Sequence, residues 1–371
     1  MHLTQAKKPM NSYEFTLVYS TFLLTSIGLL MVYTASSLKG AEQFNDPLFF
    51  FRKQTLVAIV GWCGILGIRH TPIHWLKKLT LPLLGLCCFL LSLILVPGAY
   101  QTAGGATRWL ALGPLRFQPA ELAKPALAFF LAANLARSSF QDTWGCIASN
   151  FFVFSILAYF VMLQPDFGST ALLGLLVFAM LYIKGVENKK LTTLALSGGF
   201  LAGFAIFLEP YRLRRLASFL DPWDDIQQGG FQIIQSYLAF RNGSLMGTGF
   251  GGSRQKLFFL PEAHTDFVLS VVGEEMGLLG VLSVLGLFTL IGCVGFKVAE
   301  RQKNPFYKHL AIAMTTLLVL QSSLNMGVAM GLLPTKGLTL PFLSSGASSL
   351  IVFLFCIAVL VRIAQNVTEN D

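Results

Sequence analysis

Long apolar runs recur along the whole chain, and short polar or charged segments separate them. A helix that crosses a bilayer needs roughly 20 consecutive residues that are mostly apolar. About ten runs come near that length, so the pattern predicts an all-α integral membrane protein in which residues 1–371 form a single polytopic domain. The expected transmembrane helices cover about residues 15–36, 54–69, 79–97, 120–136, 146–163, 167–184, 191–209, 267–296, 309–331 and 342–363.

Composition and charge agree with this pattern. Of the 371 residues, 54% are hydrophobic and 12% are charged, whereas a soluble domain has roughly a quarter of charged residues. The net charge of +9 does not indicate nucleic-acid binding, because the basic residues lie at the ends of apolar runs. An even number of helices places both termini on one side, and the basic short loops of that side predict the cytoplasm. The cysteines fall in or at the ends of expected helices without a CxxC pattern, so neither a disulfide nor a protein metal site is expected.

The longest polar segment covers residues 210–266, between the seventh and eighth expected helices. Loops longer than about 15 residues are usually functional or disordered. This one contains Trp223, Phe231 and an amphipathic piece at 233–240, so we predict a large, ordered extracytoplasmic loop. The other segments expected on the outer side cover about residues 37–53, 98–119 and 332–341.

Charged residues inside apolar runs are informative, since each one costs at least ~2.5–3.5 kcal/mol at the membrane centre and needs a partner. Glu121 and Lys124 interrupt the fourth run and are three residues apart, on one face of a helix, at a spacing that allows a salt bridge. A purely structural ion pair fits this pattern. So does a polar site near the outer surface, with Arg108 above it as an anion clamp.

Two aspartates lie at the expected starts of helices. Asp166 follows a helix-ending proline, and it can cap the next helix by accepting backbone N–H groups. Asp266 lies where the long loop re-enters apolar surroundings, and desolvation at such a place raises the pKa of a carboxylate toward the range of a general base. An N-cap role fits Asp266 equally well. Glu274 and Glu275 follow in the same expected helix, and at least one of them should face a polar interior.

A loop bounded by proline and glycine precedes the last expected helix, which begins with small hydroxylated residues. Lys336 in this loop could bind an anion, and Ser344 lies at the start of the hydroxylated stretch. The same pattern also fits a close-packed helix start without a ligand.

Several motifs, in this order, resemble the SEDS family (shape, elongation, division and sporulation), whose members are ten-helix peptidoglycan glycosyltransferases. The resemblance covers most of the chain, from Val32 to Ser349. Within the family, the chain is more similar to the division branch, FtsW, than to the elongation branch, RodA. One departure is at residues 344–349, where Ser-Ser-Gly-Ala-Ser-Ser replaces the common Ser-Tyr-Gly-Gly-Ser-Ser. The most specific motifs are Arg108-Trp109, Phe117-Gln-Pro-Ala-Glu-Leu-Ala-Lys124, Gln164-Pro-Asp-Phe-Gly168, Asp221-Pro-Trp223 and Gln255-Lys-Leu-Phe-Phe-Leu-Pro-Glu-Ala-His-Thr-Asp-Phe267.

The resemblance implies polymerisation of lipid II into glycan strands at the outer face of the bacterial inner membrane, for septal wall synthesis in cell division. A sugar 4-hydroxyl attacks the anomeric carbon of the growing strand, and undecaprenyl diphosphate leaves. A base must take the hydroxyl proton, and cations must stabilise the diphosphate. The resemblance makes Asp266 the candidate base. The candidate substrate-binding residues are Arg108, Glu121, Lys124, Lys256, His264, Lys336 and Ser344, with Glu121 holding Lys124 in place.

No organic cofactor is implied, but a divalent cation, Mg²⁺ or Mn²⁺, could assist the diphosphate without an all-protein metal site. The implied partners are a class B penicillin-binding protein, which crosslinks the new strands, and other divisome membrane proteins.

Two other functions fit parts of the pattern. A lipid II flippase would also have charges inside the membrane and helices broken by proline. Its sites must be reachable from both membrane faces, however, whereas the polar residues here gather toward one face. An inactive scaffold would not explain why Glu121 and Lys124 lie within the fourth expected helix.

Overall fold

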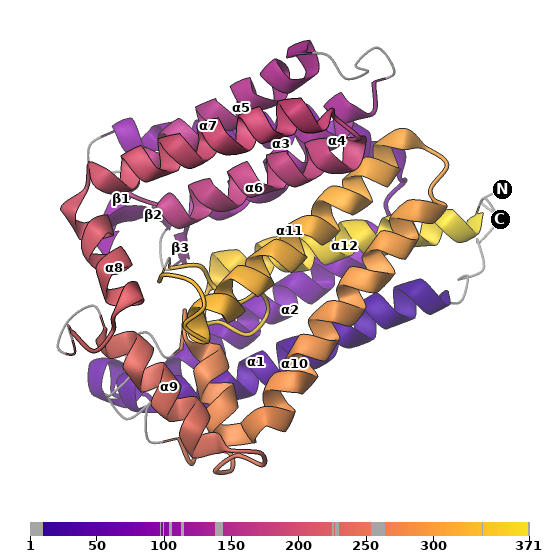
Figure 1. The fold of residues 1–371 in the computed structure, drawn as a ribbon. Coiled ribbons are helices and arrows are strands. Elements are labelled where there is room, and N and C mark those ends of the chain that lie inside the picture. Colours follow the sequence, from indigo (N-terminus) through magenta and orange to yellow (C-terminus); the bar gives the residue numbers. More distant parts are fainter. Residues whose placement is uncertain are drawn as a thin grey trace.

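Long helices lie side by side and run between two ends of the molecule (Figure 1). Nine helices in the described part of the chain are long and apolar enough to cross a membrane. The tenth long helix, α4, has 17 residues and contains the charged pair Glu121 and Lys124. The expected all-α membrane fold is confirmed by these helices together. The computed structural model describes residues 10–96, 98, 100–103, 106–112, 115–137, 144–224, 226, 230–253, 264–335 and 337–369. The ten long helices are α1 (Ser12–Phe44), α2 (Phe49–His70), α3 (His74–Ser92), α4 (Pro119–Leu135), α5 (Trp144–Leu163), α6 (Phe167–Lys184), α7 (Asn188–Phe207), α10 (Val268–Arg301), α11 (Pro305–Ala329) and α12 (Ala347–Glu369).

Helices α11 and α12 form the centre of the bundle (Figure 1). In their most apolar windows, 78% and 83% of the residues are buried, against 6% for α7. The apolar side chains that the outer helices expose suit contact with lipid, since a transmembrane helix needs no polar outer face. The interior therefore depends on close packing. Gly28 of α1, for example, lies against the backbone of Phe342, where a Cβ would stand 2.2 Å from the carbonyl oxygen.

The start of α1 and the end of α12 lie at one end of the molecule, and α8 (Pro210–Leu220) and α9 (Phe231–Gly243) lie at the other (Figure 1). The side chain of Asn11 donates to the carbonyl oxygen of Ala364 at 3.0 Å, which ties the two chain ends together. An even number of crossings produces this arrangement. We call the end with α8 and α9 the outer end.

The segment expected on the outer side at 37–53 is mostly helical, so the helix bounds expected near 36 and 54 were wrong. Helix α1 continues to Phe44, where Asn45 caps it in the left-handed conformation and donates its N–H to the carbonyls of Gly40 and Ala41. The next helix, α2, then begins at Phe49. The two helices therefore extend past the apolar core, which the apolar pattern alone could not indicate.

The outer segment at 98–119 contains a small antiparallel sheet, which the pattern had not predicted. Its strands are β1 (Tyr100–Ala103), β2 (Ala106–Leu112) and β3 (Leu115–Phe117), in the order β1-β2-β3. A 3-10 turn, η1 (Leu93–Leu95), leads from α3 toward it. Pro119 then begins α4, at a position where proline needs no N–H partner. The sheet thus carries Arg108 and Trp109 on its middle strand.

The long outer segment contains two helices, α8 and α9, and residues 254–263 lie outside the described part. The loop after α9 packs against a kink in α10 at Gly277, whose φ of 65° and ψ of −164° suit only glycine. At this kink Leu278 N–H donates to the Ser244 carbonyl at 3.0 Å. Glu274 is buried beside the kink, and its carboxylate accepts from Asn242 at 3.2 Å and from Ser253.

Candidate functional site

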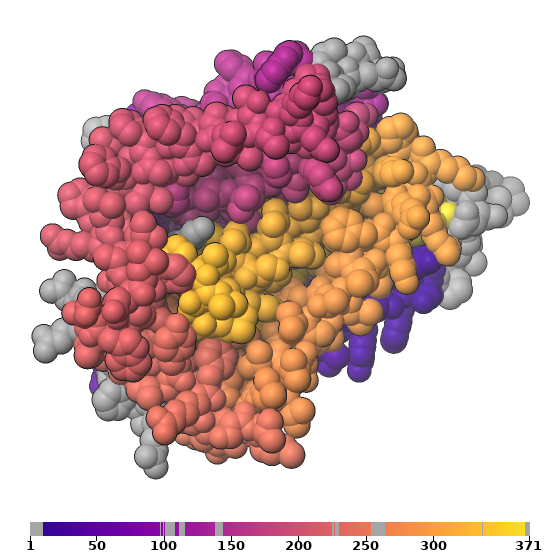
Figure 2. Space-filling view, in the orientation of Figure 1, coloured from indigo at the N-terminus to yellow at the C-terminus, as the bar shows by residue number. Residues whose placement is uncertain are grey.

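A cavity of about 970 Å³ opens near the outer end of the bundle. Figure 2 shows the surface hollowed between the helices around α7 and α8 and the yellow C-terminal part of the chain. Its described lining carries six cationic side chains and two carboxylates, Glu209 and Asp266. A cavity with this balance suits an anionic ligand. The cationic residues are Lys39, Lys53, Arg108, Arg116, Arg212 and Arg215.

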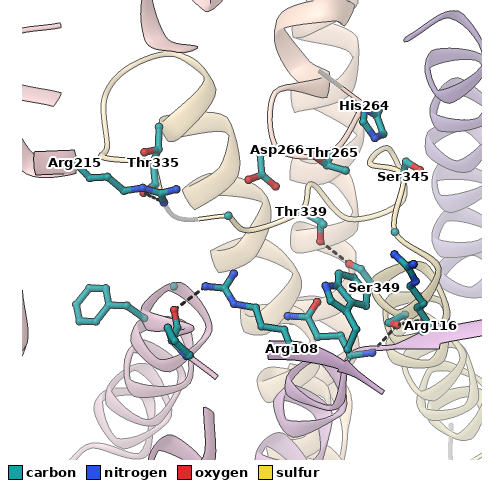
Figure 3. Close-up of a pocket in the computed structure, with 18 of the residues that line it drawn as sticks. Arg108, Arg116, Arg215, His264, Thr265, Asp266, Thr335, Thr339, Ser345 and Ser349 are labelled. Atoms are coloured by element: carbon teal, nitrogen blue, oxygen red, sulfur yellow. Dashed lines mark hydrogen bonds between the residues drawn. The ribbon is translucent and has the colours of Figure 1, made fainter. Parts of the chain in front are cut away.

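Asp266 lies among these cations, with Arg108 and Arg215 on one side and Ser345 on the other (Figure 3). The N-cap residue of α10 is Phe267, whose side chain makes no cap hydrogen bond, and the Asp266 before it lies in the cavity wall. Gly337 lies next to it. A Cβ on Gly337 would stand 3.6 Å from Asp266 Oδ2 and 3.9 Å from Arg108 Nη1. The carboxylate and the guanidinium group therefore flank this glycine.

Arg108 is oriented by two backbone carbonyls. Its Nε donates to the Gln164 carbonyl at 3.0 Å and its Nη2 to the Pro165 carbonyl at 2.6 Å. Both carbonyls belong to the turn between α5 and α6, which the sequence had placed there with almost no loop. Because two donors are held in this way, the remaining Nη1 is directed toward Gly337 and can meet an anion in the cavity.

Asp166 caps helix α6, as the sequence predicted. Its Oδ1 accepts from the Ser169 N–H at 3.0 Å, and its Oδ2 accepts from the Ser169 hydroxyl at 2.8 Å. The side-chain amide of Gln118, just before α4, also donates to Oδ2 at 3.3 Å. Asp166 is buried, and through these hydrogen bonds it fixes the turn that orients Arg108.

The pair Glu121–Lys124 is an ion pair of 2.6 Å within α4. Lys124 is fully buried, and its ammonium group also donates to Gln321 Oε1 at 2.7 Å. Neither residue of the pair lines the cavity. The prediction that Lys124 contacts a diphosphate, with Glu121 beside it, is therefore corrected: the lysine lies too deep and its described donors are directed to protein.

Ser344 and His264 connect the two outer loops. The Ser344 hydroxyl donates to the Thr265 carbonyl at 2.5 Å and accepts from the Leu340 N–H at 2.8 Å. His264 lines the cavity, and its carbonyl accepts from the Ser345 N–H at 2.8 Å. Ser344 thus holds the loop that carries Asp266 and is not part of the lining. The other two predicted binding residues, Lys256 and Lys336, lie outside the described residues.

Several cationic lining residues were missed in the sequence. Arg212 and Arg215 lie one turn apart on α8, and this spacing in a short amphipathic helix was the available signal. Arg215 donates to the Thr335 carbonyl at 3.1 Å, and Arg212 donates to the Ala205 carbonyl at 2.8 Å. These bonds join α8 to α7 and to the loop before α12, so α8 forms one wall of the cavity.

Tyr100 of β1 lies beside Gln164 in the turn between α5 and α6, but it is not suited to act as a base. Its hydroxyl donates to the Leu90 carbonyl at 2.9 Å and receives a bond of 3.4 Å from Gln164. Burial, with a smaller contribution from Cys87, raises the pKa of Tyr100 to about 12, against a lowering by Gln164. The hydroxyl therefore stays protonated at neutral pH.

The described residues contain no group of three or more His, Cys, Asp or Glu side chains that could hold a metal ion. Hard divalent cations bind oxygen ligands and often take several of them from substrate phosphates. The cavity offers the carboxylate of Asp266 for such sharing. The donor set therefore fits a cation bound jointly with a diphosphate, and does not fit an independent protein site.

Known proteins match almost the whole length of the chain. The family model described as a cell cycle protein, FtsW/RodA/SpoVE, matches residues 15–369. A probable peptidoglycan glycosyltransferase FtsW of Geobacter sulfurreducens is 39% identical, with 99% of both chains covered. A protein of the same name from Legionella pneumophila is 38% identical, covering 98% of this chain and 94% of that one.

Solved structures are similar over nearly the whole chain. A chain of a peptidoglycan synthase complex, described as coordinating polymerization and crosslinking, has a TM-score of 0.80 and 27% identity, covering 96% of this chain and 99% of that one. The rod shape determining protein RodA of Thermus thermophilus has a TM-score of 0.71 and 25% identity, covering 96% and 97%.

Proposed function

Because this chain belongs to the SEDS family of cell cycle proteins, which includes FtsW and RodA, we propose that it is a peptidoglycan glycosyltransferase of the FtsW branch that polymerises lipid II. The observation that carries the proposal is the outer cavity, in which one carboxylate, Asp266, lies among cationic side chains. A polymerase of a lipid-linked diphosphate sugar needs a base for the attacking hydroxyl and cations for the leaving diphosphate.

In this mechanism Asp266 takes the proton of the sugar 4-hydroxyl as the hydroxyl oxygen attacks the anomeric carbon. The bond between that carbon and the diphosphate oxygen breaks, and undecaprenyl diphosphate leaves with the bonding electrons. Arg108 and Asp266 both lie beside Gly337, and two backbone carbonyls fix the orientation of the Arg108 guanidinium. It stabilises the charge that develops on the diphosphate, and a Mg²⁺ or Mn²⁺ ion shared between Asp266 and the diphosphate would supply further positive charge.

The cellular setting is part of the same proposal. We place the cavity on the outer side of the bacterial inner membrane and both termini in the cytoplasm. The end with the termini carries Lys77, Lys78, Lys184 and Lys189 in or beside short connections, as the positive-inside rule requires. A class B penicillin-binding protein at the division septum is the proposed partner, since the similar synthase complex couples polymerization to crosslinking. Labelling of single cysteines from either side of inverted vesicles tests the orientation.

The deciding experiment measures glycan-strand synthesis from labelled lipid II by purified protein, alone and with its transpeptidase partner. Wild type should produce polymer, and a folded Asp266→Asn variant should not. Equal polymer from both would remove Asp266 as the base. If neither produces polymer although the partner is active, the enzyme proposal fails and a lipid II translocation assay becomes the next measurement.

A further inference from the structure

Two buried side-chain amides project from one face of α11 toward the floor of the cavity. Gln321 and Asn325 are four residues apart, so they lie one above the other on the helix. Both are buried to at least nine-tenths. Neither lines the cavity, yet each is bonded to a segment that does.

Asn325 joins the two loops that flank the candidate base. Its Nδ2 donates to the carbonyl of Asp266 at 3.0 Å and to the carbonyl of Leu338 at 2.5 Å. An amide nitrogen has two hydrogens, so these two bonds use its full donor capacity. The Asp266 backbone is thereby fixed relative to Gly337, the residue next to both its carboxylate and Arg108.

The orientation of Gln321 is set by the buried ion pair. An ammonium group can only donate, so the Gln321 atom that faces Lys124 at 2.7 Å must be the oxygen. Its nitrogen then faces Thr339 and donates to the backbone carbonyl at 2.9 Å. The Thr339 hydroxyl in turn shares a bond of 2.7 Å with the Ser349 hydroxyl, and both line the cavity (Figure 3).

We propose that Asn325, supported one turn away by Gln321, is a positioning residue for the transfer reaction: it fixes the Asp266 carboxylate beside Arg108 through the two carbonyls that it binds. This inference rests on the proposed function. It also gives Lys124 a role through Gln321 in place of contact with substrate. Since catalytic geometry must be held within about 0.5 Å, a loop base needs a support of this kind from a rigid helix.

The test is Asn325→Asp, which keeps the shape of the side chain and replaces the NH2 group by an oxygen that carries at most one hydrogen. At least one of the carbonyls of Asp266 and Leu338 would then lose its donor, and the loop would shift. A displacement of about 1 Å can cost roughly 100-fold in rate. We therefore expect kcat for glycan synthesis to fall about 10- to 100-fold per folded molecule, while KM for lipid II changes less than about threefold.

Asn150 provides a matched control. It is buried in α5, where its Nδ2 donates to the Cys146 carbonyl at 2.9 Å and its oxygen accepts from Asn134 at 2.9 Å. Asn150→Asp therefore makes the same chemical change far from Asp266. It should lower thermal stability by a similar amount and leave kcat within about threefold of wild type, because the loop remains in place.

Each result separates the positioning role from the proposed function. An inactive wild type would count against the glycosyltransferase itself. An active wild type with unchanged kcat in folded Asn325→Asp, or a loss that appears only in KM, would overturn the positioning role. If Asn325→Asp does not fold, Asn325→Ser decides in the same way, because the shorter hydroxyl can serve at most one of the two carbonyls.

Discussion

Replacing Lys124 by methionine should destabilise the protein far more than a surface lysine substitution does. The ammonium group is 2.6 Å from Glu121 Oε1 and 2.7 Å from Gln321 Oε1, and the two charged side chains are 0% and 5% exposed. Methionine fills a similar volume without the charge, so the change leaves the Glu121 carboxylate in the interior without its cation. The other carboxylate oxygen already has no hydrogen-bond partner among the described residues.

The size of the effect follows from this burial. Removing one partner of a buried ion pair costs about 3–5 kcal/mol, because the remaining charge is uncompensated. Removing both charges is often close to neutral. The double variant Glu121→Leu/Lys124→Met should therefore recover the part of the loss that comes from the uncompensated charge. It should retain a cost of about 1–3 kcal/mol, since the oxygen of Gln321 stays buried without a donor.

Lys190→Met is the matched control. Lys190 and Glu187 have the same three-residue spacing, but their nitrogen and oxygen are 3.5 Å apart and Glu187 is 49% exposed. Such a pair contributes about 0–1 kcal/mol. The free energy of unfolding would be measured for all variants by titration with SDS in mixed micelles. If Lys124→Met cost no more than Lys190→Met, or if the double variant were as unstable as Lys124→Met, the argument from an unpaired buried charge would be refuted.

Three further predictions concern the cavity and the kink. Arg108→Ala should lower kcat/KM for lipid II at least about tenfold. Arg108→Lys should not restore it, because one ammonium group cannot replace a guanidinium group held by two carbonyls. A kcat/KM near the wild-type value for either variant, measured by steady-state kinetics, would contradict this. Gly277→Ala should destabilise the protein by about 1–3 kcal/mol or more, since its Cβ would stand 2.4 Å from the Gly247 nitrogen. In the same SDS titration Gly286→Ala, where nothing lies within 4 Å, should cost nothing, and equal costs would contradict the account. Removal of divalent cations with EDTA should lower kcat and added Mg²⁺ should restore it; unchanged activity would exclude the shared cation.

The helices could be predicted from the sequence because a bilayer sets a length that the apolar runs must match. Their ends could not, since helix α1 continues to Phe44 through polar residues that no apolar pattern marks. The sheet of β1 to β3 was missed for a related reason. Its strands have three to seven residues, and strands this short leave hardly any periodic signal.

For the candidate site, the sequence could identify charged residues but not the direction in which they face. Asp266 and Arg108 were found, and the structure brings both to Gly337. Lys124 was placed in the same site because its helix begins near the outer surface, yet its side chain packs inward against Gln321. The partners of a buried charge come from distant segments, and a single sequence does not show which segments meet.

The same reasoning explains why polar side chains of the long helices matter for a site built on loops. Irregular backbone at membrane depth is tolerated only where protein or a water-filled cavity satisfies its polar groups. Here the carbonyl of Leu338 receives the amide of Asn325, and the carbonyl of Ser344 receives the amide of Gln54 from α2 at 3.1 Å. These amides satisfy two loop carbonyls and also fix the course of the loop. The stability of the loops and the position of Asp266 therefore have one physical cause. A substitution that removes such an amide should change both properties, whereas the loss of an amide elsewhere in the bundle should change stability alone.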